Sequence, residues 1–390
     1  MPASPSTARA INDRLALRLL QQEGPLTAGQ LKQLTGLSRP SVADLVERLA
    51  AAGLIGVVGE SGEQRRGPNA RLYGIVADRA HFAALDVRTE GVSVVVCDLL
   101  GRVLTEASVP IGGDTGTGPA VEQAVALVER AAKEGGVAEL HTLGIGAPGL
   151  IDPASGELRD SGGLPAWHRR LVLALQERLP ATRVHVENET NLAALAEQRE
   201  GAARDRDTFV LLWLGHGTGA AVVLDGSLRR GASGGTGEIG FLPVPGTAVL
   251  PSATDCEGGF HSLAGSAAIA ALAAEHGLTA EGDGYEPVAA GLVRQAVAQA
   301  SAAFLDALAD RLAVGVASVA AVLDPGCVVL GGEVGEAGGP DLAARVEHRV
   351  RRMSPLPTEV RAGVLGGGAV LRGALLTARD RAQDDVFAPR

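Results

Sequence analysis

Residues 209–231 read FVLLWLGHGTGAAVVLDGSLRRG. Its apolar runs are joined at glycines and at an Asp-Gly pair, a pattern that predicts three consecutive strands connected by tight turns. Residues 81–111, HFAALDVRTEGVSVVVCDLLGRVLTEASVPI, show the same pattern. A predicted helix and a further strand follow each set: a helix at about 117–134 before TLGIGAP, and one long helix at about 289–323 before CVVLGG. The sequence therefore predicts that one α/β unit occurs twice.

Such a duplication favours an α/β body of the actin-like, ribonuclease-H-like architecture, in which ligands bind in the crevice between the two halves. We expect the body to cover residues 79–390, with one lobe at about 79–205 and the other at about 206–390. The polar tail at about 378–390, ARDRAQDDVFAPR, is expected to be frayed and flexible, without a role of its own.

Residues 1–78 have the pattern of a separate DNA-binding domain. Apolar residues at helical spacing predict three helices before residue 53. Thr27 and Ser38 precede the second and third helices, where a hydroxyl group can cap the helix, and Gly36 ends the second. Two predicted strands, LIGVVGE and RLYGIV, then flank the loop SGEQRRGPNA. This order is that of a winged helix-turn-helix, whose last helix enters the major groove of DNA.

The residues of this domain that we expect to contact DNA lie at two places. Ser38, Arg39 and Ser41 begin the third helix and can meet phosphates or base edges. Arg65 and Arg66 form the tip of the predicted wing, and paired arginines suit the negative potential of a narrow minor groove.

The distribution of charge agrees with this division. The chain has a net charge of −10, yet residues 1–80 hold ten basic and seven acidic side chains, against 25 and 38 in the rest. Only the head is therefore suited to contact a polyanion. Three widely spaced cysteines argue against a disulfide framework, and no apolar run reaches the ~18 residues of a membrane span. With no apolar signal core at the N-terminus, we expect a cytoplasmic protein with no membrane partner.

Four motifs resemble the ROK family of repressors, open reading frames and sugar kinases. They are GIGAPGLIDPASGEL (144–158), VENETNLAALAE (186–197), LGHGTGAAVVLDGSLRRGASGGTGEIG (214–240) and LGGEVGEAGG (330–339). The resemblance covers essentially the whole chain, and the predicted winged helix resembles that of the family's transcriptional regulators. For the kinases of the family it implies a glycine-rich hairpin for ATP, an Asp base for the sugar hydroxyl, and a zinc site close to the sugar.

This chain departs from the kinase pattern at the nucleotide and zinc positions. Its first hairpin reads DVRTEG (86–91), so Arg88 and Thr89 replace the glycines that let backbone N–H groups approach phosphate, and Glu90 would repel it. Phe241 stands where the resemblance implies a zinc-ligating His, and Cys256 is the one thiol of the later cysteine motif. We therefore expect no cofactor, no metal and no kinase activity.

The sugar-binding positions are mixed. Gly149, Asn188 and Glu238 match the resemblance, and His261 falls where the family has a Glu. Glu189 replaces the Asp base with a side chain one methylene longer, and three interpretations stay open: a misaligned base, a ligand contact, or a residue that only stabilises a helix start capped by Asn188. Fewer polar partners should weaken a plain hexose, so an acidic or phosphorylated sugar is one hypothesis.

Together these residues favour a transcriptional regulator of carbohydrate metabolism, a repressor rather than an activator on the family's pattern. Its inactive kinase-like body would form a homodimer or homotetramer and sense a sugar or sugar phosphate, while its heads bind an inverted-repeat operator in double-stranded DNA. Two alternatives remain: an active sugar kinase with a DNA-binding head, and a regulator without an effector, whose body is an oligomerisation scaffold.

Overall fold

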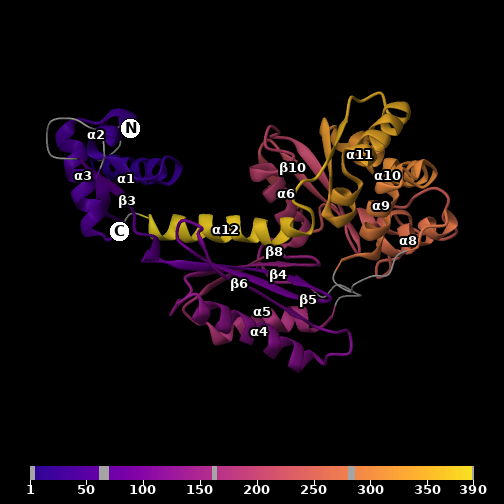
Figure 1. The fold of residues 1–390 in the computed structure, drawn as a ribbon, viewed down its shortest axis with the longest axis horizontal. Helices are drawn as coiled ribbons and strands as arrows, with labels where there is room; N and C mark the ends of the chain where they lie inside the picture. The colour runs from indigo at the N-terminus through magenta and orange to yellow at the C-terminus, as the bar shows by residue number, and fades with distance from the viewer. Residues whose placement is uncertain (1–4, 61–69, 160–164, 280–285, 389–390) are drawn as a thin grey trace.

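The computed structural model describes residues 5–60, 70–159, 165–279 and 286–388 of the chain. Figure 1 shows a small N-terminal head at one end of the molecule and two larger lobes, with helix α12 running between the head and the lobes. Within the described ranges, no helix is both long enough and apolar enough to cross a bilayer.

The head has the three predicted helices and the two strands of the predicted wing. Its elements are α1 (Pro5–Gln22), β1 (Leu26–Thr27), α2 (Ala28–Thr35), α3 (Arg39–Ala51), β2 (Ile55–Glu60) and β3 (Arg71–Ile75), with the strands in the order β1-β3-β2. Thr27 and Gln30 form a capping box at the start of α2, and Gly36 ends it with φ at +71°. The predicted winged helix-turn-helix is therefore confirmed.

The two lobes contain the same sheet. The first has strands β4 (His81–Arg88), β5 (Gly91–Asp98), β6 (Val103–Pro110), β7 (Thr142–Ala147) and β8 (Arg183–Asn188), in the order β6-β5-β4-β7-β8. The second has β9 (Phe209–Leu214), β10 (Thr218–Leu224), β11 (Ser227–Arg229), β12 (Cys327–Gly331) and β13 (Glu359–Ala362), in the order β11-β10-β9-β12-β13. In both sheets three antiparallel strands are followed by two parallel ones, so the predicted duplication is confirmed.

Helices cover both sheets. In the first lobe they are α4 (Thr117–Glu134), α5 (Trp167–Arg178) and α6 (Glu189–Glu200); in the second they are α7 (His261–Ala264), α8 (Ser266–Glu275), α9 (Val288–Ala298), α10 (Ala302–Leu323) and α11 (Gly332–Met353). Short 3-10 turns lie at η1 (Ala77–Arg79), η2 (Ile239–Phe241) and η3 (Gly366–Gly368). The actin-like architecture places α6 between the lobes, where its residues share one buried core with β4 and β9.

The single long helix expected at about 289–323 is wrong. The chain forms α9 and α10 instead, and Ala300 between them has a left-handed φ of +51°. A left-handed residue cannot continue a right-handed helix, so the chain changes direction there. No glycine or proline marks the break, which is why apolar periodicity continued through it.

The expected frayed tail is also wrong. Residues 378–386 belong to α12 (Ala369–Val386), in which Ala378 and Ala382 are fully buried. Gln383 donates from Nε2 to the carbonyl of Leu99 at 2.7 Å, which fixes the helix beside the β5–β6 turn. The many polar residues on the outer face of this helix made the segment look like a polar tail, although its other face is buried.

Helix α12 also changes the lobe boundary. It packs against β4, β7 and α6, and in Figure 1 it lies along the first sheet and ends beside the head. The expected assignment of all residues from 206 to the second lobe is therefore wrong for α12. Gly373 allows the close approach, since a Cβ there would lie 2.0 Å from the Leu192 carbonyl oxygen of α6.

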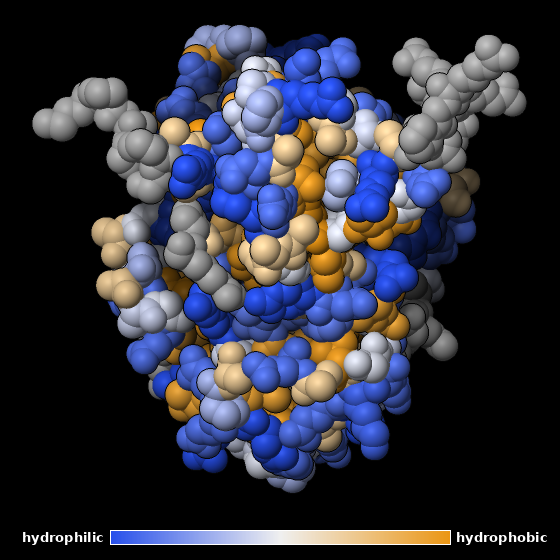
Figure 2. Space-filling view, turned by 90° about the vertical axis from the view of Figure 1, so that its left-hand side faces the viewer, coloured by the Kyte–Doolittle hydropathy of each residue, from blue (hydrophilic) through white to orange (hydrophobic). Residues whose placement is uncertain are grey.

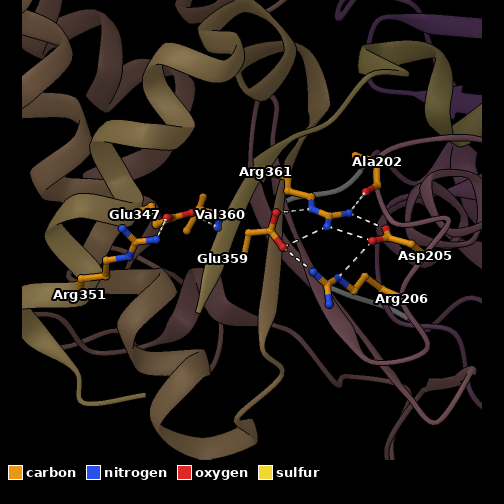
Figure 3. Close-up of polar contacts among 8 residues, drawn as sticks. All are labelled: Ala202, Asp205, Arg206, Glu347, Arg351, Glu359, Val360 and Arg361. Atoms are coloured by element: carbon orange, nitrogen blue, oxygen red, sulfur yellow. Dashed lines mark hydrogen bonds and ion pairs between the residues drawn. The ribbon is translucent and has the colours of Figure 1, made fainter. Parts of the chain in front are cut away.

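The chain passes between the lobes at 201–208 and again at 363–368, and polar networks fasten both crossings. Figure 3 shows Arg361 of β13 donating to Asp205 at 2.6 and 3.1 Å, to the Ala202 carbonyl at 2.8 Å, and to Glu359 at 2.9 and 3.0 Å. Arg206 reaches the same Glu359 at 2.6 Å. The first crossing is therefore tied directly to the edge strand of the second sheet.

Glu197 joins the two crossings to each other. Its side chain is 1% exposed and accepts hydrogen bonds from the backbone N–H groups of Ala202 at 2.7 Å, Val364 at 2.9 Å and Leu365 at 3.0 Å. Three donors on one buried carboxylate satisfy groups that would otherwise be left without partners. The end of α6 is thus the anchor of the interlobe connection.

Candidate ligand cleft and DNA-binding surface

The start of α3 presents the residues predicted to contact DNA. The Ser38 hydroxyl accepts from the Ser41 backbone N–H at 3.3 Å and lies 2.8 Å from the Ser41 hydroxyl, so it caps the helix. Arg39 and Ser41 are exposed in the first turn of α3. Arg65 and Arg66 lie outside the described residues. Ser38, Arg39 and Ser41 are thus all exposed, and Ser38 also caps the helix; their contact with DNA stays a prediction.

Figure 2 looks at the molecule from the head side. Hydrophilic residues cover most of this face, and apolar residues gather in a strip near its centre. On the described part of the head, the exposed large apolar side chains are Ile11, Leu15, Leu34, Val57 and Val58. They are spread over α1, α2 and β2, so the start of α3 is left polar and open to a polyanion.

The ligand site predicted between the lobes begins at the N-terminus of α6. Asn188 caps this helix, accepting from the backbone N–H groups of Thr190 at 2.9 Å and Asn191 at 3.2 Å. Its Nδ2 donates to the Gly149 carbonyl at 3.0 Å. Gly149 has φ at +103°, a conformation that favours glycine. The capping role predicted for Asn188 is confirmed, and two of the predicted site residues are in contact.

Arg88 fills the position where the resemblance places a phosphate-binding glycine. Its guanidinium group donates to Asp86 at 2.9 Å, to Glu333 at 2.5 Å and to the Gly367 carbonyl at 2.5 Å. Asp86 lies beside it on β4, whereas Glu333 is at the start of α11 and Gly367 precedes α12. Arg88 therefore bridges the lobes. Its guanidinium N–H groups are already bonded to three acceptors.

A second bridge across the cleft was not found by sequence reasoning. Arg230, just after β11, donates to Glu187 at the end of β8, with Nε–Oε2 at 2.7 Å and Nη2–Oε2 at 2.5 Å. Glu187 also accepts from the Asn191 amide at 2.9 Å. The partners are 43 residues apart and lie in different lobes, so no local pattern connects them.

Glu189 lies in the cleft among other carboxylates. Burial raises the pKa of Glu189 to about 8, and the nearby charges of Asp86, Glu333 and Glu238 act in the same direction, while Arg88 opposes them. Glu189 is therefore largely uncharged at neutral pH, so its charge adds little to the stability of the helix start. The charge of Glu238 therefore acts on Glu189, and the role of both residues in ligand binding stays a prediction.

The raised pKa of Glu189 predicts how stability depends on pH. A carboxyl group whose folded pKa exceeds its ordinary 4.5 stabilises the fold while protonated, and this stability is lost as pH rises towards 8. Glu189→Gln removes the ionisation, so the variant should match the wild type near pH 5. Above pH 8 it should be more stable by on the order of 5 kcal/mol. Thermal melts at both pH values measure this, and a pH-independent difference would contradict it.

His261 and Phe241 belong to short helical turns of the second lobe. His261 opens α7 and is half-buried, and burial lowers the pKa of its imidazole. Phe241 ends η2 and is 38% exposed, so it lies partly in solvent. Among the residues that the structure describes, no group of three His, Cys, Asp or Glu side chains is placed to hold a metal ion.

Comparison with known proteins agrees with this geometry. Residues 82–381 match the ROK family model, and residues 11–67 match the MarR family model. The DNA-binding transcriptional dual regulator NagC of Escherichia coli K12 is 29% identical over 244 residues, which are 60% of this chain. The matched region spans 58% of the length of NagC.

Solved structures show the same fold. A ROK family transcriptional regulator, described as a homologue of the E. coli MLC protein, has a TM-score of 0.74 at 20% identity, with 97% of this chain and 98% of that chain covered. A ROK glucokinase from Streptomyces griseus, in complex with glucose and AMPPNP, has a TM-score of 0.63 at 25% identity, over 77% of this chain and 100% of that chain. The chain belongs to the ROK family and has a MarR-like winged-helix domain in front of its ROK body.

Proposed function

We propose that this protein is a DNA-binding transcriptional regulator, a repressor, whose body senses a sugar without phosphorylating it. The observation that carries this proposal is the combination of an exposed α3 start with a nucleotide position occupied by Arg88. The regulators among its relatives support the same assignment. The body forms a homodimer, so its two heads meet an inverted repeat in DNA.

The loss of kinase activity rests on Arg88. A bound nucleotide would need its phosphates close to backbone N–H groups at this hairpin, and a guanidinium group tied to Asp86 and Glu333 fills that space. Displacing it would expose two carboxylates to the phosphates, and like charges in a partly buried site repel strongly. Arg88 thus disfavours ATP both sterically and electrostatically.

The effector that this cleft accepts best is an uncharged sugar. A phosphate group near Glu189 would meet Asp86, Glu238 and Glu333. Arg88 and Arg230, which bridge the lobes, already neutralise carboxylates of the protein. The acidic or phosphorylated sugar considered from sequence is therefore disfavoured. A thermal-shift panel of glucose, xylose, N-acetylglucosamine and their phosphates tests this, and a chain stabilised by none of them is an effector-independent regulator.

One observation favours a second candidate, an active sugar kinase. A carboxyl group with a pKa of about 8 lies close to the pH at which a general base works, and such groups concentrate in active sites. Coupled release of ADP from ATP with a panel of hexoses separates the two functions. Hexose-dependent turnover that Glu189→Gln abolishes would establish the kinase, and its absence supports the regulator.

The DNA-binding role makes a prediction for Arg39. Duplexes selected by the protein from a random pool should bind the Arg39→Ala variant about tenfold more weakly, with a salt dependence shallower by about one ion per head. Arg351→Ala is the matched control, since Arg351 is an exposed arginine on α11 of the second lobe. Fluorescence anisotropy over a range of salt concentrations measures both quantities. Equal affinity of the two variants would remove α3 from the interface.

A further inference from the structure

A pocket of about 530 Å³ lies in the seam between the head and the body. Arg14, Arg18 and Gln21 of α1 line one side, and Arg379, Asp380, Gln383 and Asp384 of α12 line the other. Its size is that of a site for a small molecule. The walls come from two elements far apart in the chain, so a ligand in this pocket would touch the DNA-binding domain and the body together.

The pocket has an excess of positive charge that its own acidic residues do not cancel. Arg379 is 3.5 Å from Asp380, but Asp380 has a nearer partner in Arg199 at 2.5 Å, outside the pocket. Arg14 is 3.5 Å from Asp384, and both side chains are largely exposed, so this ion pair is weak. In the described part of the chain no ion pair involves Arg18. Three guanidinium groups thus face two carboxylates, Asp380 and Asp384, which leaves an excess of one positive charge in the pocket.

Two of the side chains on α12 are also held in place. The Arg379 side chain packs against the β5–β6 turn, where a Cβ on Gly101 would be 3.4 Å from its Cδ. Gln383 is 9% exposed and its amide is bonded to the Leu99 carbonyl at 2.7 Å. Positioned guanidinium groups bind phosphate and carboxylate through paired hydrogen bonds and lose little freedom in doing so.

We propose that this seam pocket binds a small multivalent anion, a metabolite with two or more phosphate or carboxylate groups, and that the bound anion fixes the head against the body. The backbone of DNA is the other source of phosphate. The pocket is lined by α1, α12 and the turn at Leu100, whereas the DNA-facing residues begin α3, which favours the small anion.

The test is a calorimetric titration of the full chain with inorganic pyrophosphate at constant ionic strength, without DNA. The proposal expects saturable binding at one site per chain. Arg18→Ser with Arg379→Ser should weaken this binding by about tenfold or more, since the double variant removes charge-assisted hydrogen bonds to the anion. Arg381→Ser is the matched control on the same helix, because Arg381 faces His185 outside the pocket, and it should bind as the wild type does.

Three results would overturn the proposal. The first is a titration without saturable heat, and the second is equal binding by the wild type and the double variant, which would place the anion elsewhere. The third is competition between pyrophosphate and a selected DNA duplex for the same arginines, which would make the pocket part of the DNA-binding surface. Arg18→Ser alone, on an exposed side chain, repeats the test if the double variant melts early.

Discussion

Gly373→Ala is expected to lower the free energy of unfolding by about 3 kcal/mol. The new Cβ would lie 2.0 Å from the carbonyl oxygen and 2.5 Å from the carbonyl carbon of Leu192, both backbone atoms of α6. Since neither atom can rotate away, α12 must separate from α6. Urea unfolding measures the loss as a lower midpoint.

Gly291→Ala provides the matched control for this change. Gly291 is also inside a helix, α9, but no atom lies within 4 Å of the position of its Cβ. The better helix propensity of Ala should stabilise this variant by about 0.5–1 kcal/mol. Equal unfolding midpoints for the two variants would contradict the close packing of α12 on α6.

Glu197→Ala is expected to cost on the order of 4 kcal/mol, because it leaves three backbone N–H groups at the interlobe crossings without their acceptor. The amides of Ala202, Val364 and Leu365 should also exchange hydrogen faster. Calorimetric melts and hydrogen exchange measure the two effects.

The control for Glu197 is Glu347, a carboxylate that accepts fewer backbone hydrogen bonds. Glu347 accepts one backbone N–H group, that of Val360 at 2.8 Å, and pairs with the exposed Arg351, as Figure 3 shows. Its replacement by Ala should cost about 1 kcal/mol. A loss at Glu197 no larger than the loss at Glu347 would show that the crossings are not held by this buried side chain.

Local chemistry made much of the fold predictable. Thr27, Gly36, Ser38 and Asn188 act within a few residues of their own positions, so spacing alone identified the helix ends that they form. The two strand sets showed apolar runs broken at turns, and the shared sheet order follows from that repetition. These features depend on residues that are close in the sequence, so sequence patterns can predict them.

The parts that sequence could not predict depend on distant partners. Arg88 was expected to block a nucleotide, but its bonds to Glu333 and Gly367 join residues 245 and 279 positions away. The bridge from Arg230 to Glu187 also joins residues that are distant in the sequence, and so does the packing of α12 on the first sheet. Ala300 shows a different limit, since its φ is left-handed although alanine is not a residue type that favours this conformation.

The most direct test of the proposed function is the affinity of the full chain for a duplex that it selects, compared with a scrambled duplex of equal length at physiological salt. A winged-helix regulator with base contacts from α3 should bind the selected duplex at least about 10³-fold more tightly. Equal affinity for the two duplexes would contradict the account, because the head would then contact DNA through charge alone.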